Sequence, residues 1–492
     1  MSGYIERITG NTGERLLREL SVRLWRELTG KKPETGLAEL MRGYSDFGER
    51  ELFRSVWDSR PEGDEGGAGR LLAASFLGTM FILSRSAALE DAVNNAETGK
   101  FTSGGKKLSL RSIHAELARQ PKRGERELAV SAAKPAQEKQ NTLLRKKLDA
   151  MTECAQALGF GDYGELAGET SGLVRGNAAE EAKAFLADTE YASKDILTWF
   201  LAKKLELKPR QAEEHDIAFL LNSDELKGNF PRRDMISFSR PILEASGLIP
   251  EGGISYDSER SPGKISDGFS LPLDPPASTG ISIYPAGSIR DYEHFFGSLG
   301  RALSFMFTER EDYLEFKWLR DEAVESAFDS LFRGLVYEPR WLAKYLRIDD
   351  EGDFRRFLGL RWLMSARYLT GLSVYEADLF KNSETESMPE HYERIMGSSL
   401  HCRIDAGGYL RPLTRLTRAS SAFHGAASAP ALSNYLRERF DEEWWRVPGA
   451  GDFFKDLWRE GGRVTMRRLA EITGGEKPGS DPLKSYFGNL FD

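Results

Sequence analysis

Apolar residues recur every three to four positions over most of this 492-residue chain, and this period constrains the fold more than any other feature. Such spacing is typical of amphipathic helices that bury one face. It is clearest in Arg15–Leu28, Asn141–Leu158, Glu322–Leu335 and Asn434–Trp445. Strand patterns are scarce, and the best is Gly268–Gly287, where FSLPL and GISIY flank turn residues. We therefore predict a mainly α protein with one small β-sheet at about residues 268–287.

The charge balance and the cysteine count limit the class of protein. The net charge is −8, and this modest acidic excess argues against nucleic acid as a partner. Two cysteines, Cys154 and Cys402, in so long a chain are typical of reduced thiols. The N-terminus lacks an apolar signal core, and the most apolar run, Leu71–Ser84, is too short to span a bilayer. We expect a cytoplasmic protein without a membrane segment, in which this run forms a buried helix.

One segment differs in composition from the rest and suggests a division of the chain. Gly99–Lys139 is basic, and Phe101 is its single aromatic residue. Nucleic-acid binding usually interleaves aromatic with basic residues, so we favour an exposed, mobile loop with a short helix over a nucleic-acid patch. The expected organisation is an N-terminal helical region, residues 1–140, that ends in this loop, followed by a second domain, residues 141–492.

A glycine motif looks like a dinucleotide-binding fingerprint but has the wrong context. GFGDYG contains Gly159, Gly161 and Gly164 in GxGxxG spacing. The motif follows a predicted helix, whereas dinucleotide binding needs a strand before the glycines. We interpret it as a helix C-cap followed by a turn.

The segment FFGSLGRALSF, Phe295–Phe305, has the apolar frame of a zinc-peptidase helix. Such a helix carries HExxH, in which two histidines one turn apart bind zinc and the glutamate acts as general base. The segment resembles the metal helix of the oligoendopeptidase F and thimet oligopeptidase family, which reads roughly HELGHALH. These gluzincin peptidases are related to angiotensin-converting enzyme and carboxypeptidase Taq. Four residues match the family segment: Leu299, Gly300, Ala302 and Leu303.

Every chemically important position of that helix differs. Gly297 stands in place of the first histidine, and Ser298 in place of the catalytic glutamate. Arg301 stands in place of the second histidine, and Ser304 in place of the trailing one. By the resemblance, Glu322 falls at a suitable distance for the third zinc ligand. The motif is therefore degenerate, and we expect no zinc and no other cofactor.

The resemblance extends over about residues 140–492 and implies a two-lobed helical clam with a deep central groove. Four further segments support it: Leu144–Leu166, the strands that end in GISIYPAGS, Asp321–Phe332 and Tyr435–Ile472. The vestigial metal helix is expected at about residues 291–307. The family activity is zinc-dependent oligopeptide hydrolysis, so the chain is interpreted as an inactive pseudopeptidase with a peptide-binding or regulatory role.

Two sets of residues follow from this interpretation. We expect Arg301 to pair with Glu322 or Glu325 and to replace the charge of the metal; alternatively, the acidic residues of that helix form a solvated face. A peptide or unfolded protein segment, or another protein partner, would lie in the groove as a strand added to the sheet edge. The expected peptide-binding residues are Ile281, Ile283, Tyr284, Ala286 and Tyr409.

Three alternatives remain open at this stage. The groove could host non-zinc hydrolysis through Ser298, His294, Tyr409 or His424. A metal site could be rebuilt from other ligands, which would leave an active peptidase. The groove could also be filled, with a new surface interaction instead. The family's oxyanion-stabilising tyrosine cannot be placed, because Pro430 is expected to interrupt the helix in its region.

Overall fold

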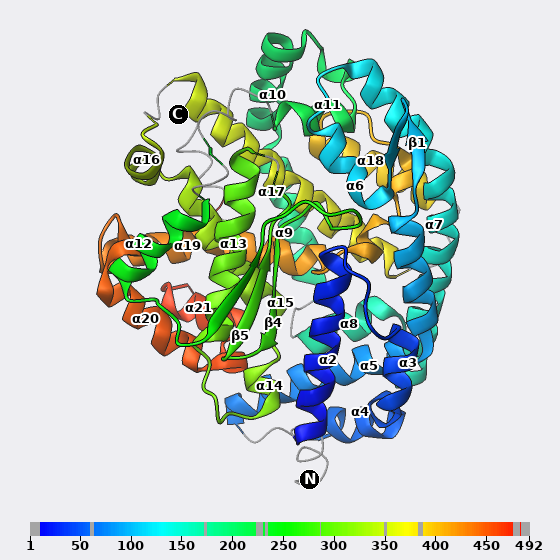
Figure 1. Cartoon of the computed structure of the whole chain (residues 1–492), viewed down its shortest axis with the longest axis vertical. Helices are drawn as coiled ribbons and strands as arrows, with labels where there is room; N and C mark the ends of the chain where they lie inside the picture. Colours follow the sequence, from blue (N-terminus) through cyan, green and yellow to red (C-terminus); the bar gives the residue numbers. More distant parts are fainter. Residues whose placement is uncertain are drawn as a thin grey trace.

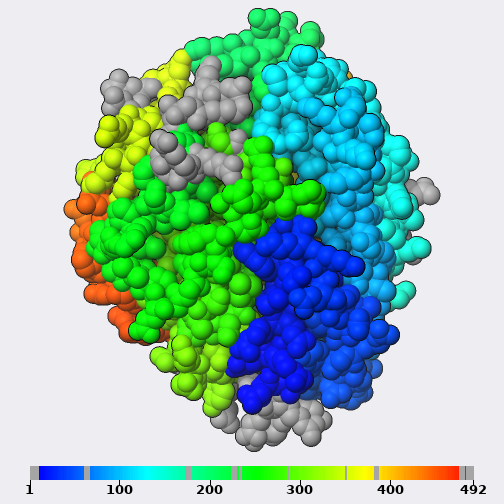
Figure 2. Space-filling view, in the orientation of Figure 1, coloured from blue at the N-terminus to red at the C-terminus, as the bar shows by residue number. Residues whose placement is uncertain are grey.

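The computed structural model confirms the mainly helical class with small sheets. It describes residues 10–59, 63–171, 175–222, 230–231, 235–285, 287–348, 352–381, 387–475 and 483, with only the backbone for 63–66 and 175–178. The N-terminal segments lie on the right of Figure 1, and the sheet and the C-terminal helices lie in its centre and on its left. On the face shown in Figure 2, α2 (Asn11–Leu28) lies directly against the segment that forms the sheet.

The N-terminal part is built from helices around one long central helix. Their bounds are α2 (Asn11–Leu28), α3 (Leu37–Gly43), α4 (Arg50–Trp57), α5 (Gly63–Thr98), α6 (Leu110–Leu117) and α7 (Arg123–Leu158). The apolar run Leu71–Ser84 lies within α5, and its core-facing residues, such as Leu77 and Phe81, are buried as expected. α5 is longer than the run, and Gly67–Thr98 is long and apolar enough to cross a membrane, although 56% of its most apolar window is buried. A core helix of a soluble protein can have the same length and composition, and α5 packs against α3, α4, α7 and α8 (Tyr163–Ser171).

The expectation of an exposed loop over Gly99–Lys139 is wrong. A hairpin of β1 (Phe101–Ser103) and β2 (Lys106–Leu108) is followed by α6, and α7 then begins at Arg123. The cause is a small satellite core within this basic stretch, formed by Leu108, Ile113, Leu117, Ala129 and Ala133. The expected division at residue 140 lies inside α7, which continues without interruption to Leu158. α7 ends at Gly159 with φ 97°, which confirms the C-cap interpretation of the glycine motif.

Helices of different lengths make up most of the described chain after α7. Those that form the core or frame the sites below are α8 (Tyr163–Ser171), α9 (Arg175–Asp188), α10 (Glu190–Leu205), α11 (Glu214–Leu220), α12 (Met235–Ser246), α13 (Ile289–Met306), α14 (Leu314–Lys317), α15 (Glu322–Gly334), α16 (Pro339–Trp341), α17 (Asp353–Leu379), α18 (Met388–Leu400), α19 (Ala419–Arg439), α20 (Pro448–Arg459) and α21 (Met466–Ile472). Short 3₁₀ turns join several of them, including η2 (Pro209–Gln211) and η8 (Arg411–Thr414). α15 packs closely against both α13 and α19.

The sheet near α13 has three strands in the order β3-β5-β4. β3 (Gly253–Asp257) pairs parallel with β5 (Ser278–Ser282), and β4 (Phe269–Asp274) pairs antiparallel with β5. α2 packs on one face, because a Cβ at Gly280 would lie 2.6 Å from the Trp25 ring. Successive strand residues face opposite sides, so Ile281 faces away from Trp25, and α13 contacts β4 and β5. Figure 1 shows α2 and α13 on either side of the strands.

Candidate active-site region

The helix that contains Phe295–Phe305, α13, is a core helix. Ser288 precedes it, and the Asp291 carboxylate in its first turn accepts a 2.6 Å hydrogen bond from the Gly287 N–H. Residues 295–300 are all buried, so this part of α13 is covered on every side. Arg301 is the next residue and keeps 23% of its side chain exposed.

A side chain at Gly297 would collide with the carboxylate of Asp329. A Cβ built at this position would lie 2.7 Å from a carboxylate oxygen of Asp329 on α15. Real Cβ atoms are essentially never that close to a neighbour. Asp329 is held by Arg333, whose Nε donates to it over 2.9 Å. An imidazole at position 297 would therefore require the Asp329–Arg333 pair to move.

Arg301 pairs with Glu325, one of the two carboxylates named from the sequence. The contact joins Nη2 of Arg301 to Oε2 of Glu325, and it is an ion pair without directed hydrogen-bond geometry, since Oε2 of Glu325 has no hydrogen-bond partner. Glu322 instead accepts a 3.0 Å hydrogen bond from Arg418, which also donates to the Ala167 carbonyl over 2.9 Å. Burial alone would raise the pKa of Glu322, but the charge and hydrogen bond of Arg418, together with a hydrogen bond from Ser421 and the charge of Arg301, lower this pKa.

A second buried ion pair lies one turn before Gly297 and was not predicted from the sequence. Glu293 receives a 2.9 Å hydrogen bond from Nε of Arg361 on α17, a second contact from the same guanidinium, and the Tyr337 hydroxyl proton. Burial by itself would raise the pKa of Glu293, but Arg361 and Tyr337 lower it to about 2. Glu293 is therefore a structural anion at neutral pH.

The residues considered for non-zinc hydrolysis do not converge. Ser298 is 1% exposed, so no substrate reaches its hydroxyl in this conformation. Nδ1 of His294 accepts a 2.8 Å hydrogen bond from the Gly268 N–H, and burial lowers the His294 pKa to about 3. No hydrogen bond joins Ser298 to His294 among the described residues. His424 lies on α19 and bonds the Ser420 carbonyl over 2.7 Å.

The strand expected to be a sheet edge is the central strand. Ile281 is paired with Tyr256 of β3 on one side and with Ser270 of β4 on the other. The Ile283 N–H donates to the Asp257 carbonyl over 2.9 Å, so this residue is also paired. A peptide cannot add to backbone that is already bonded on both sides. The assignment of Ile281–Ala286 as the sheet edge is therefore wrong for residues 281–283, because β3, a strand not predicted from the sequence, lies outside β5.

The other expected binding residues lie apart from this strand or are already in contact with protein groups. The ring of Tyr284 lies 5.8 Å from both the Arg119 and the Arg260 guanidinium. Tyr409 is buried, and its hydroxyl accepts a 2.5 Å hydrogen bond from Arg145 on α7. Ala286 lies outside the described residues.

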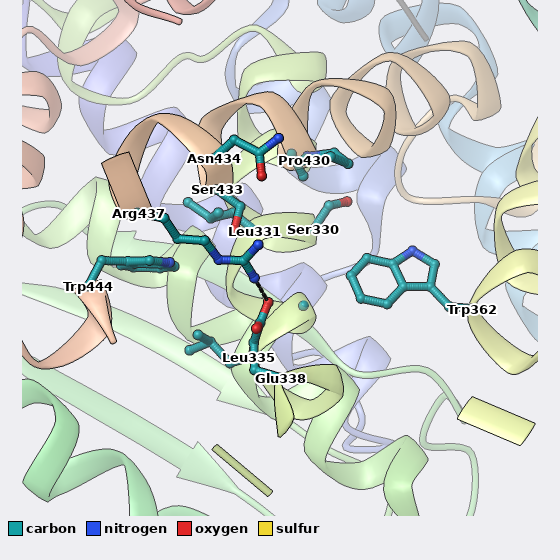
Figure 3. Close-up of a pocket in the computed structure, with 12 residues that line it drawn as sticks. Ser330, Leu331, Leu335, Glu338, Trp362, Pro430, Ser433, Asn434, Arg437 and Trp444 are labelled. Atoms are coloured by element: carbon teal, nitrogen blue, oxygen red, sulfur yellow. Dashed lines mark hydrogen bonds and ion pairs between the residues drawn. The ribbon is translucent and has the colours of Figure 1, made fainter. Parts of the chain in front are cut away.

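Pro430 does not interrupt its helix, which corrects another expectation. α19 runs from Ala419 to Arg439 with Pro430 inside it. Its buried residues, including Ala427 and Leu432, pack in the core, and tertiary packing outweighs the lost backbone hydrogen bond. Pro430 lines a small pocket of about 20 Å³ between α15, α17 and α19, where Arg437 pairs with Glu338 (Figure 3). This space holds about one water molecule and is too small for a peptide.

A zinc ion does not fit the residues around α13. Structural and catalytic zinc sites use imidazole, thiolate or carboxylate ligands. Position 297 offers no side chain, Arg301 offers a cation, and Glu325 is engaged by Arg301. Among the described residues, no three histidine, cysteine, aspartate or glutamate side chains come together as metal ligands.

Comparison with solved structures identifies the fold. PZ peptidase A, solved with an inhibitor, superposes with a TM-score of 0.64 at 14% identity, over 98% of this chain and 87% of that one. A structure assigned as oligoendopeptidase F superposes with a TM-score of 0.65 at 14% identity, over the same shares. The chain has the fold of these peptidases. No protein-family model and no curated protein matches the sequence, so the peptidase fold is established here by shape.

Asp321, at the start of α15, gives the candidate site a measurable pH dependence. Its side chain accepts a 2.8 Å hydrogen bond from the Ala323 N–H, and burial raises its pKa to about 6. The folded protein therefore holds this proton more tightly than the unfolded chain, and the Asp321 contribution to stability falls as the pH rises from about 4 to 6. Asp321→Asn keeps an N-cap oxygen and should remove this fall. Urea unfolding of the wild type and the variant across this pH range measures the difference. An equal fall of the free energy of unfolding with pH in both proteins would contradict the prediction.

Proposed function

We propose that this chain is a pseudopeptidase of the oligoendopeptidase F and thimet oligopeptidase type, without zinc-dependent hydrolysis, that binds a peptide or protein segment. The observation that carries the proposal is the Arg301–Glu325 pair beside Gly297. A guanidinium occupies the helix position of a ligand imidazole and neutralises a carboxylate that faces it. The Asp329 carboxylate fills the space of the other imidazole.

Further ion pairs around α13 support a structural role for these charges. Arg333 pairs with Asp329, Arg418 with Glu322, and Arg361 with Glu293. In each pair, the arginine balances the charge of a carboxylate that is at least partly buried. Burial of an unpaired carboxylate costs free energy. A general base for hydrolysis needs a free carboxylate or imidazole within reach of water. The carboxylates of these pairs are already engaged by arginines.

Peptide binding is better supported at β3 than at β5. The Gly253 N–H donates to the Ala277 carbonyl and the Ile283 N–H donates to the Asp257 carbonyl, so the odd-numbered residues of β3 bond to β5. In a parallel pair, the backbone N–H and C=O groups of the alternate residues point away from the neighbouring strand. The backbone groups of Ile254 and Tyr256 therefore face outwards. The Tyr256 side chain is 41% exposed. We place an added peptide strand along this edge.

The metal and activity test uses the full chain after dialysis against zinc, with an intact HExxH peptidase in parallel. We expect less than about a tenth of a zinc equivalent per chain by plasma mass spectrometry, because tight sites need several deprotonated ligands. Hydrolysis of quenched fluorogenic peptides should equal the buffer rate. One bound zinc together with chelator-sensitive hydrolysis would overturn the proposal.

Binding is tested separately with a mixture of random-sequence peptides of about nine residues, long enough to pair along an edge strand. Tyr256→Pro removes the outward N–H but no bond to β5, so it should abolish peptide retention and preserve the fold. Tyr256→Phe is the matched control and should retain the peptides. Equal retention by both variants would exclude β3 as the binding edge.

A further inference from the structure

A depression of about 920 Å³ lies between α10, η2 and the end of α18, away from α13. Its wall on α10 carries Lys194 and Thr198, and η2 with the residue before it contributes Lys208, Pro209 and Arg210. The third wall runs from Gly397 to Arg403. None of these residues belongs to the candidate site around α13, and the inference below does not depend on the proposed function.

The charges of this depression are unbalanced. Lys194, Lys208 and Arg210 have no carboxylate partner in the part of the chain that the structure describes. The acidic group in the wall, Glu190, is engaged by the buried guanidinium of Arg367 over 2.9 Å. Arg403 is the one wall cation with an acidic partner, Glu213. Three free cations therefore surround one concave surface, where an anion gains more than it would at scattered surface lysines.

The walls of the depression are joined to one another by hydrogen bonds. The Arg403 N–H donates to the Ala212 carbonyl over 2.9 Å, and the Glu214 N–H donates to the Arg403 carbonyl over 3.0 Å. These bonds join the segment after α18 to the segment after η2. Nε2 of His401 lies 2.8 Å from Oγ of Ser193, which joins the same segment to α10.

His401 belongs to this frame and is not an additional cation. It has φ 55° at the end of α18, and 5% of its side chain is exposed. Burial, with Arg367 nearby, lowers its pKa to about 4, so its ring is neutral at pH 7. Ser193 is completely buried and its hydroxyl bonds the Thr189 carbonyl over 2.6 Å, so the Ser193–His401–Glu190 group is a structural contact and not a hydrolytic triad.

From this arrangement we infer that the depression binds a polyphosphate-bearing anion through Lys194, Lys208 and Arg210. Three cations on one concave surface match the several charges and oxygens of linked phosphates, which accept charge-assisted hydrogen bonds from lysine and arginine. Tyr191 is 82% exposed and lies three residues before Lys194 on α10, hence on a neighbouring face of the helix. This aromatic ring can stack on a base if the polyphosphate belongs to a nucleotide.

The test is calorimetric titration of the full chain with inorganic tripolyphosphate and with ATP at low salt. We expect tripolyphosphate to bind, and the double variant Lys194→Gln/Arg210→Gln to weaken binding at least about tenfold, because two charge-assisted contacts are lost. The control is Lys134→Gln/Lys139→Gln, which removes the same charge from two exposed positions on α7 and should leave binding unchanged. Circular dichroism verifies that both variants fold.

The two probes distinguish the possible sources of the phosphates. Tighter binding of ATP that is lost in Tyr191→Ala would identify a nucleotide, and equal binding of both probes would identify inorganic polyphosphate. No binding of tripolyphosphate at millimolar concentration overturns the inference. Equal weakening by the control variant also overturns it, because the effect would then come from net charge and not from the depression.

Discussion

Replacing Arg361 with methionine should lower the free energy of unfolding by about 3–5 kcal/mol, which is the usual cost of leaving one member of a buried ion pair alone. Arg361 and Glu293 keep only 8% and 6% of their side chains exposed. Without the guanidinium, the Glu293 carboxylate keeps the Tyr337 hydroxyl but loses its balancing charge. Urea unfolding followed by circular dichroism measures the loss.

Two further variants make this prediction specific. Glu293→Gln/Arg361→Met removes both charges and should recover about 2 kcal/mol, because residues in one ion pair are coupled. Arg467→Met is the matched control, since Arg467 is 76% exposed and pairs with the exposed Glu471, and it should change stability by less than about 0.5 kcal/mol. An Arg361→Met loss no larger than that of the control would show that the buried pair does not support the core.

Replacing Gly425 with alanine should destabilise the protein by about 3 kcal/mol, the upper end of the usual cost of overpacking. A Cβ at Gly425 on α19 would lie 2.4 Å from the Ser326 Cβ and 2.5 Å from the Ala327 nitrogen of α15. The second contact is with backbone, so α19 and α15 would have to separate. Thermal unfolding should give a clearly lower Tm.

The control for this variant is Gly124→Ala in α7, where nothing lies within 4 Å of the added Cβ. Alanine favours helix over glycine, so this change should raise stability by about 0.5–1 kcal/mol. The two substitutions are chemically identical and differ only in the space around the Cβ. Similar effects of both would contradict the close approach of α15 and α19.

The helical period and the residue identities allowed part of the fold to be predicted from the sequence. Helix formation depends on spacing within one segment, and the mainly α class and the cap at Gly159 were predicted correctly. Local patterns failed where distant residues supply the packing. The basic segment after Gly99 forms a hairpin and helices because its few apolar residues meet in a small core, and α19 continues through Pro430 because its faces are buried.

By itself, the sequence determined that positions 297, 298 and 301 carry glycine, serine and arginine, which have no imidazole or carboxylate with which to bind or assist zinc. The tertiary structure decided which side chain fills the space beside Gly297 and which arginines pair with the nearby carboxylates. Arg301 reaches Glu325 while Glu322 is held by Arg418, and β5 lies between β3 and β4 instead of at the edge. Ion-pair partners and strand neighbours are contacts between residues far apart in the chain, so spacing within a segment cannot specify them.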